Sequence, residues 1–201
     1  MAVEEVNLPL VKGGPFLTTK LLGTLGVVGA QMFVLDAVYR RAYGLGGGPN
    51  DRVSSVLNLL YVVGWASSAV ALRRLRATGR GRAARAAFII QCAGLALAGF
   101  VALAEALDLG AVTTQPFYFV LDAAWPLSHL FMLAVGALVR RAGVWRGWRR
   151  LGCFACGLAL PSYFAALPLL GEDARFAFVA LVTAGFTLLG IAVRTAKEVS
   201  R

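Results

Sequence analysis

The sequence predicts an all-α fold: a polytopic integral membrane bundle of six transmembrane helices that forms one domain over residues 1–201. Of these residues 59% are hydrophobic and 15% are charged, whereas soluble chains are about 45–50% apolar and about 25% charged. Six stretches are as long and apolar as a bilayer crossing, which takes roughly 20 residues. No segment alternates with the two-residue period of a transmembrane β-barrel. The six stretches are residues 20–39, 53–72, 86–108, 117–139, 149–170 and 175–194.

The distribution of basic residues predicts the orientation. Of the 20 Lys and Arg residues, 16 lie in the N-terminal segment, in the loops around residues 73–85 and 140–150, and in the C-terminal tail. The other four are Arg40, Arg41, Arg52 and Arg175. Because Lys and Arg accumulate in cytoplasmic loops, both termini and both Arg-rich loops are predicted to be cytoplasmic. The alanine- and arginine-rich composition favours the inner (plasma) membrane of a bacterium.

The net charge of +10 suggests nucleic-acid binding, but the positions of the basic residues argue against it. Basic patches that bind nucleic acids lie on soluble surfaces, whereas these residues stand next to the ends of the predicted spans. There they anchor helices and meet anionic lipid headgroups, at about 1 kcal/mol each. The expected partners are therefore membrane lipids and no nucleic acid.

The first predicted helix, residues 20–39, follows the segment 6–18, which prolines and glycines interrupt. We interpret this segment as an interfacial lead-in to the helix. Two glutamates near the start stand where a cleavable signal peptide has basic residues, so none is expected. Asp36 lies in the outer part of the helix, four residues before Arg40, and this spacing favours a helical ion pair.

The second predicted helix, residues 53–72, carries Asn58 and Tyr61 at outer or middle depth. The third, residues 86–108, has a face of small residues at strict four-residue spacing. This face consists of Gly94, Ala98, Ala102 and Ala106. Small residues let a neighbouring backbone approach closely, and the neighbour is either another helix of this chain, a second copy or a membrane partner. Glu105 falls within about 20° of this face, so it is predicted to face protein and not lipid.

The fourth predicted helix, residues 117–139, has the most specific pattern. Asp122, Trp125 and His129 recur at three- and four-residue spacing, which places them on one helix face. Pro126 has no N–H group and frees the backbone carbonyl of Asp122, so the helix is expected to bend there. A carboxylate, an indole and an imidazole on one face of a bent helix are suited to line a binding cavity.

One pentapeptide of the first helix, residues 33–37, recurs letter for letter at residues 119–123. In an inverted-repeat transporter such copies lie in matching helices. Here the two copies lie at different depths of their predicted spans. Coincidence among apolar residues is therefore the favoured interpretation, and common ancestry is the alternative.

The fifth predicted helix, residues 149–170, contains Cys153 and Cys156, and the sixth covers residues 175–194. A CxxC pair can exchange disulfides, but this pair is predicted at the cytoplasmic face, where thiols stay reduced. Together with Cys92 the pair could hold a soft metal ion only if all three thiols cluster. Packing is the favoured interpretation. No cofactor is expected, because the sequence has no phosphate-binding loop, HExxH motif or pair of haem-ligating histidines.

Seven residues within the predicted spans are candidates for a polar site, and all of them lie at mid-depth or in the half that faces away from the cytoplasm. They are Asp36, Asn58, Tyr61, Glu105, Asp122, Trp125 and His129. Because an ionisable group inside a membrane is costly, these residues predict an outward-facing polar pocket for a cation, a proton or a small polar solute. One alternative is a non-catalytic structural or accessory subunit in which the charges only pair with arginines. A further alternative is an enzyme that modifies a lipid or isoprenoid with His129 as general base, although no nucleophile stands at an interpretable spacing.

Overall fold

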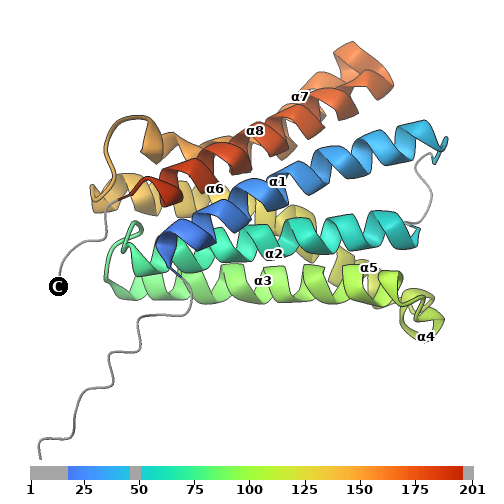
Figure 1. The fold of residues 1–201 in the computed structure, drawn as a ribbon, viewed down its shortest axis with the longest axis horizontal. Coiled ribbons are helices and arrows are strands. Elements are labelled where there is room, and N and C mark those ends of the chain that lie inside the picture. Colours follow the sequence, from blue (N-terminus) through green and yellow to red (C-terminus); the bar gives the residue numbers. More distant parts are fainter. Residues whose placement is uncertain (1–17, 46–50, 197–201) are drawn as a thin grey trace, which may run out of the picture.

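The computed structural model describes residues 18–45 and 51–196 (Figure 1). These residues are 85% helix and contain no strand, so the predicted all-α fold is confirmed. The six long helices are α1 (Thr19–Ala42), α2 (Arg52–Arg74), α3 (Arg82–Ala106), α6 (Ala124–Ala142), α7 (Leu151–Leu170) and α8 (Ala174–Arg194). The predicted lead-in before residue 18 and the last two basic residues of the C-terminal tail, Lys197 and Arg201, lie outside the described residues.

Five helical stretches of the described chain are long and apolar enough to cross a membrane. The last stretch, Gly147–Arg194, includes both α7 and α8. These two helices run in opposite directions beside each other, and the short helix η2 (Gly171–Asp173) joins them (Figure 1). The apolar helices are those of a membrane-embedded protein.

The long helices form a closed ring. Each helix packs against two neighbours, in the order α1, α2, α3, α6, α7, α8 and back to α1. Buried aromatic side chains fill the middle of the ring, and they come from α2 (Tyr61 and Trp65), α6 (His129) and α8 (Phe186). The core of the bundle is therefore aromatic and lies between helices that are distant in the sequence.

Glycines set the closest approach between helices. A Cβ atom added to Gly29 of α1 would lie 2.6 Å from the Cα of Gly64 on α2. A Cβ atom on Gly190 of α8 would lie 2.7 Å from the backbone nitrogen of Val27 on α1. Without side chains at these points the backbones touch, which is how membrane helices associate when no hydrophobic effect drives them together.

The small-residue face of α3 also meets helices of this chain. Gly94 packs against Ser128 of α6, and Ala98 and Ala102 are buried inside the bundle. Ala106 is half-buried at the end of the helix. Contact of this face with a second copy or a membrane partner stays a prediction.

The predicted helix at residues 117–139 is interrupted. It divides into the short helix α5 (Tyr118–Asp122) and α6, with Ala123 between them. Pro126 has no N–H to donate to the carbonyl of Asp122, so the ladder of hydrogen bonds is open at this point. The bend expected there is thus a one-residue break, and Asp122 ends α5.

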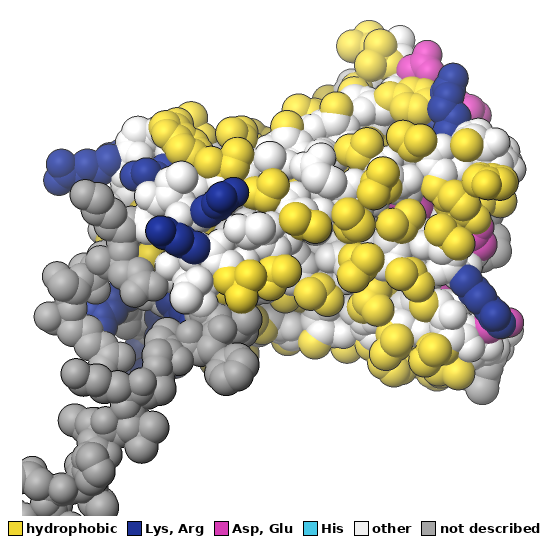
Figure 2. All heavy atoms as spheres, in the orientation of Figure 1, with side chains coloured by type: hydrophobic (Ala, Val, Ile, Leu, Met, Phe, Trp, Pro, Cys, Tyr) yellow, Lys and Arg dark blue, Asp and Glu magenta, His cyan; other side chains and the backbone are white. Residues whose placement is uncertain are grey.

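Charge is segregated along the bundle (Figure 2). Large apolar side chains cover the middle of the face shown, Lys and Arg gather at one end, and Asp and Glu occur only towards the other end together with a few arginines. We call these the basic end and the acidic end. All described acidic residues lie in the acidic half: Asp36, Asp51, Glu105, Asp108, Asp122, Glu172 and Asp173. An apolar belt between two charged ends is the surface expected of a membrane protein.

Candidate functional site

A cavity of about 260 Å³ lies at the acidic end between α1, α2, α3 and the α5–α6 break. Its polar lining consists of Asp36, Arg40, Asn58, Glu105, Asp122 and the indole of Trp125. Small or apolar side chains of α1, α2 and α3, such as Phe33, Val62 and Ala98, complete the walls. We call this space the acid cavity.

Asp36 is the most deeply placed carboxylate of the acid cavity, with an exposed fraction of 8%. The hydroxyl of Ser54 on α2 donates a hydrogen bond of 2.5 Å to its Oδ1 atom. Arg40, one turn further along α1, and Asn58 of α2 also lie within interaction range of this carboxylate. Asp36 therefore joins α1 to α2 and sits beside a positive charge.

Ser54 is held in place by the start of α2. Asp51 caps this helix by accepting a hydrogen bond of 2.8 Å from the backbone N–H of Ser54. The hydroxyl of Tyr39 on α1 donates a second hydrogen bond to Asp51, at 2.6 Å. Hydrogen bonds to the charged form, first from Tyr39 and then from Ser54, lower the pKa of Asp51 below its usual 3.8.

Glu105 of α3 lines the acid cavity and is half-buried. The hydroxyl of Ser55 on α2 donates to its Oε2 atom at 3.0 Å. The hydroxyl of Tyr118 on α5 donates to its Oε1 atom. Through these two bonds Glu105 links α3 to α2 and to the short helix that ends at Asp122.

Asp122 stands exposed at the rim of the acid cavity. Within the described residues its carboxylate makes no hydrogen bond or ion pair, and its electrostatic neighbour is Glu105. Below it, Trp125 stacks on Phe33 with 5.9 Å between the ring centroids. The acid cavity therefore brings three carboxylates and one guanidinium above an aromatic wall, and it is negative when all four groups are charged.

Tyr61 and His129 lie beneath the acid cavity and do not line it. Both are buried, with exposed fractions of 1% and 0%, and the Tyr61 hydroxyl lies 3.1 Å from Nε2 of His129. The other ring nitrogen, Nδ1, faces the backbone of Cys156 but makes no hydrogen bond of good geometry. Of the seven candidate residues, the structure thus places five around one cavity and two in the core below it.

A metal site at the cysteines, which was the alternative to packing, depended on the three thiols lying together. Cys153 and Cys156 are fully buried on α7, whereas Cys92 is half-buried on α3. Those two helices are not neighbours in the ring. Residues 18–45 and 51–196 contain no group of three His, Cys, Asp or Glu side chains that could hold a metal ion.

The arginines near the acidic end take positions that sequence reasoning did not predict. Arg40 lines the acid cavity. Arg41 lies over the ring of Phe176 on α8, 5.0 Å from the centroid. It borders a second cavity of about 380 Å³ between α1 and α8, which also includes Arg40 and Arg175.

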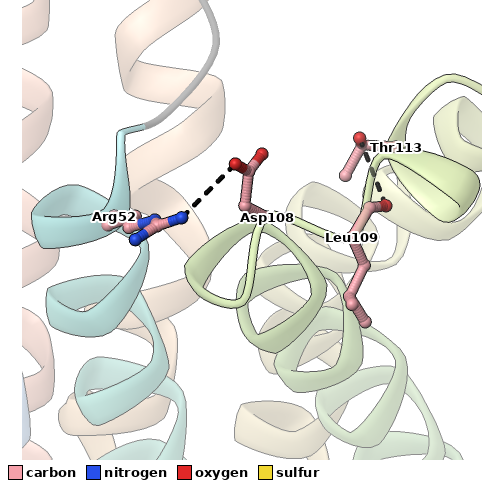
Figure 3. Close-up of polar contacts among 4 residues, drawn as sticks. All are labelled: Arg52, Asp108, Leu109 and Thr113. Carbon is pink, nitrogen blue, oxygen red and sulfur yellow. Dashed lines mark hydrogen bonds and ion pairs between the residues drawn. The ribbon is translucent and has the colours of Figure 1, made fainter.

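Arg52 pairs with Asp108, the last residue of the predicted span 86–108 (Figure 3). Their nitrogen and oxygen atoms are 3.4 Å apart, and both side chains are largely exposed. The pair links the start of α2 to the turn after α3. Figure 3 shows Asp108 on this turn. The short helix α4 (Gly110–Thr113) follows, and the hydroxyl of Thr113 donates a hydrogen bond to the carbonyl of Leu109, the residue before this helix.

Sequence reasoning missed the hydroxyl groups that hold the carboxylates. Ser54 and Ser55 are adjacent in the first turn of α2, and both are fully buried. Two consecutive serines one turn before Asn58 were a readable signal, since polar side chains in a span seek partners on neighbouring helices. Tyr118 gave no such signal, because tyrosine is common at membrane interfaces.

The chain matches no protein-family model, and it shows no significant similarity to a curated protein or to a solved structure. The function must therefore be inferred from the geometry of the site.

Proposed function

We propose that the chain is a six-span protein of the inner (plasma) membrane that binds a small organic cation, such as an amine or a guanidine, in the acid cavity. The basic end lies in the cytoplasm and the acidic end faces outward. The segregation of charge supports this orientation. The opposite directions of α7 and α8 support two crossings by the last apolar stretch. The Arg-rich basic end contacts anionic headgroups.

The observation that carries the proposal is the convergence of three carboxylates from three different helices on one cavity. Arg40 offsets only one of these charges, so a cation is favoured over an anion. Trp125 lines the cavity, and a cation that sits over an indole ring gains about 0.5–2 kcal/mol. The volume of about 260 Å³ lies just below the range of pockets for drug-sized ligands, which begins at about 300 Å³. A small solute therefore fits.

A bare metal ion fits the cavity less well than an organic cation. A metal needs several ligands within about 2–2.6 Å of one point, and the described residues contain no group of three such ligands. An ammonium or guanidinium group instead makes longer hydrogen bonds to carboxylates that are spread over a cavity. Exposed Asp122 at the rim meets the solute first, and Asp36 holds it at depth.

The test is a binding titration of the full-length protein in lipid nanodiscs. Ethylammonium, putrescine and guanidinium are added, with ethanol and urea as uncharged controls, and tryptophan fluorescence reports occupancy because Trp125 lines the cavity. We expect a saturable change with at least one cation. Asp122→Asn should weaken binding by about tenfold or more, because a hydrogen bond to a charged group is worth about 1.5–3 kcal/mol. Equal affinity for charged and uncharged solutes would contradict the proposal.

Asp108→Asn is the matched control for this titration. Asp108 lies at the same end of the bundle, but its carboxylate is exposed, pairs with Arg52 and does not line the acid cavity. It should leave cation binding unchanged. If Asp108→Asn and Asp122→Asn weaken binding equally, only the general negative charge of the acidic end attracts cations.

The hydrogen bonds to Asp36 and Glu105 favour a second candidate, a non-catalytic structural or accessory subunit. In that case the carboxylates tie helices together and no solute enters. Asp122→Asn would then have no effect in any solute assay, and the protein would co-purify with a membrane partner at fixed stoichiometry.

Uptake by proteoliposomes of whichever cation binds separates transport from simple binding.

A further inference from the structure

A third and smaller space lies in the basic half of the bundle, between α2, α3, α6 and α8. Towards the basic end it is lined by Arg73, at the end of α2, and by Thr78 in the following turn, and towards the middle of the bundle it is lined by Trp65, Gln91 and Met132. Its volume of about 20 Å³ exceeds the roughly 10–15 Å³ that one water molecule requires. We call this space the basic-side pocket.

Polar atoms without partners point to water in the basic-side pocket. Gln91 has an exposed fraction of 3% and Trp65 one of 2%. Among the described residues, neither the amide nitrogen and oxygen of Gln91 nor the indole nitrogen of Trp65 has a hydrogen-bond partner. Leaving such groups dry costs about 1–3 kcal/mol each. Water in the pocket removes this cost, since Gln91 and Trp65 supply three polar atoms between them.

Only a thin septum separates the basic-side pocket from the acid cavity. On α2 the acid cavity reaches Val62 and the basic-side pocket reaches Trp65, and three residues of helix rise about 4.5 Å. On α6 the corresponding residues are Trp125 and Met132, which are about 10.5 Å apart along the axis. The residues that line the two spaces are therefore separated along the bundle axis by only a part of a membrane core, which is about 30 Å thick.

His129 lies within this septum. Its ring centroid is 4.6 Å from that of Trp125, which lines the acid cavity, and 4.6 Å from that of Trp65, which lines the basic-side pocket. Phe178 and Phe186 of α8 pack against the ring as well. Of the groups that face it, only Tyr61 of α2 and Cys156 of α7 are titratable. An imidazole can accept a proton at one nitrogen and release a proton from the other, which no neighbouring ring can do.

We infer that the Tyr61–His129 pair passes protons across this septum, so that the chain conducts protons between the acid cavity and the basic-side pocket. One proton enters the pair from water on one side and one proton leaves it to water on the other, and no bond to carbon, oxidant or reductant is involved. Because neither residue lines either space, each transfer requires water to enter the septum past Trp125 or Trp65. The inference rests on the proposed function for the two-sided membrane topology, but not for the cation that binds.

The test uses the full-length protein in liposomes that contain a pH-sensitive dye. A potassium gradient with valinomycin sets the membrane potential, and the rate of internal pH change is measured. We expect the protein to raise proton flux about tenfold or more over protein-free liposomes, and His129→Phe to remove this increase, because a positioned acid–base group contributes about 10²–10⁴-fold to proton transfer. Met132→Leu is the control, since it lines the same pocket and conserves volume.

Gln91→Leu is the second variant, and it keeps the test decisive if His129→Phe does not fold. It removes the polar atoms of the basic-side pocket without touching the imidazole, and we expect it to reduce the flux severalfold. Wild-type flux equal to that of protein-free liposomes overturns the inference. So does unchanged flux in a folded His129→Phe or Gln91→Leu variant.

The nanodisc titration separates the two ideas. Proton flux that depends on His129 in a protein that binds no cation would refute the cation site and leave the proton path. Cation binding without proton flux would do the reverse.

Discussion

Replacing Gly29 by alanine tests the close approach of α1 and α2. The new Cβ would lie 2.6 Å from the Cα of Gly64, and 3.2 Å from both its nitrogen and the carbonyl oxygen of Leu60. Carbon atoms pack at about 3.5–4.0 Å, so the two helices must separate here by about 1 Å, a gap that forfeits a quarter to a half of each dispersion contact. All nearby atoms belong to backbone, so no side chain can move aside.

Overpacking of this kind costs about 1–3 kcal/mol. We expect a value in the upper half of that range, about 2–3 kcal/mol, because α1 and α2 share the most extensive interface of the ring. The free energy of unfolding is measured by titrating mixed micelles with sodium dodecyl sulfate and following helix content by circular dichroism.

Gly99→Ala on α3 is the matched control. Its Cβ would lie 3.6 Å from the nearest atom, a methyl carbon of Val62, which is an ordinary contact. Both substitutions improve helix propensity equally. The difference between their effects on the free energy of unfolding therefore reports only the contact between α1 and α2. If Gly29→Ala and Gly99→Ala change the free energy of unfolding by the same amount, the argument that α1 and α2 touch through their backbones is refuted.

Three further predictions concern single polar groups. Tyr61→Phe leaves both nitrogens of the buried His129 ring without hydrogen bonds and should cost about 1–3 kcal/mol in the same titration; no loss would mean that the ring has another partner. Asp51 has a pKa below 3.8 in the folded protein because of the two hydrogen bonds that it accepts. Its ionised carboxylate therefore stabilises the fold at pH values above the unfolded-state pKa. This contribution is lost as the pH falls through the lower pKa of the folded state. The melting temperatures of wild type and Asp51→Asn should therefore differ at pH 7 and converge towards pH 3, and parallel curves would contradict this. Asp108→Asn breaks an exposed ion pair and should change the free energy of unfolding by no more than about 1 kcal/mol, so a loss above about 2 kcal/mol would show that the turn after α3 depends on it.

The positions of the helices could be predicted from the sequence because a bilayer leaves a chain little choice. Backbone groups that cannot meet water must bond within a helix, so apolar length alone locates each element. The stretch predicted at 53–72 is the helix Arg52–Arg74, and the stretch predicted at 175–194 is Ala174–Arg194. Apolar length does not show the break at Ala123, since hydropathy does not register a single open hydrogen bond, and it was Pro126 that indicated a bend at this point.

The candidate site could be predicted in part, because helix depth and helix face are both readable from spacing. Asp36 and Asp122, the acids of the recurring pentapeptide, line one cavity although one lies inside α1 and the other ends α5. Tyr61 and His129 have suitable depths, yet they pack beneath the cavity. Spacing along one helix does not show which neighbouring helix covers a residue. That neighbour determines whether the residue lines the cavity or packs in the core.

The tightest helix contacts could not be predicted from spacing for the same reason. The four-residue series on α3 was conspicuous, whereas the backbones touch at Gly29 and Gly64. Glycine is frequent in membrane helices whether or not a neighbour approaches. Only the tertiary arrangement shows which glycines meet another backbone.

The glycine contacts also make one side of the bundle stiffer than the other. Where α1 meets α2 and α8, backbone presses on backbone, and such a contact can be neither compressed nor repacked by turning a side chain. The opposite side of the acid cavity is built differently, because Asp122 ends the five-residue helix α5. The backbone hydrogen bond from residue 126 to the carbonyl of Asp122 is missing, and the hydrogen bond from Tyr118 to Glu105 ties α5 to α3. The acid cavity thus has one stiff wall, which carries Asp36, and one compliant wall, which carries Asp122. Solutes of different sizes would be accommodated by displacement of α5, while the stiff wall keeps its shape.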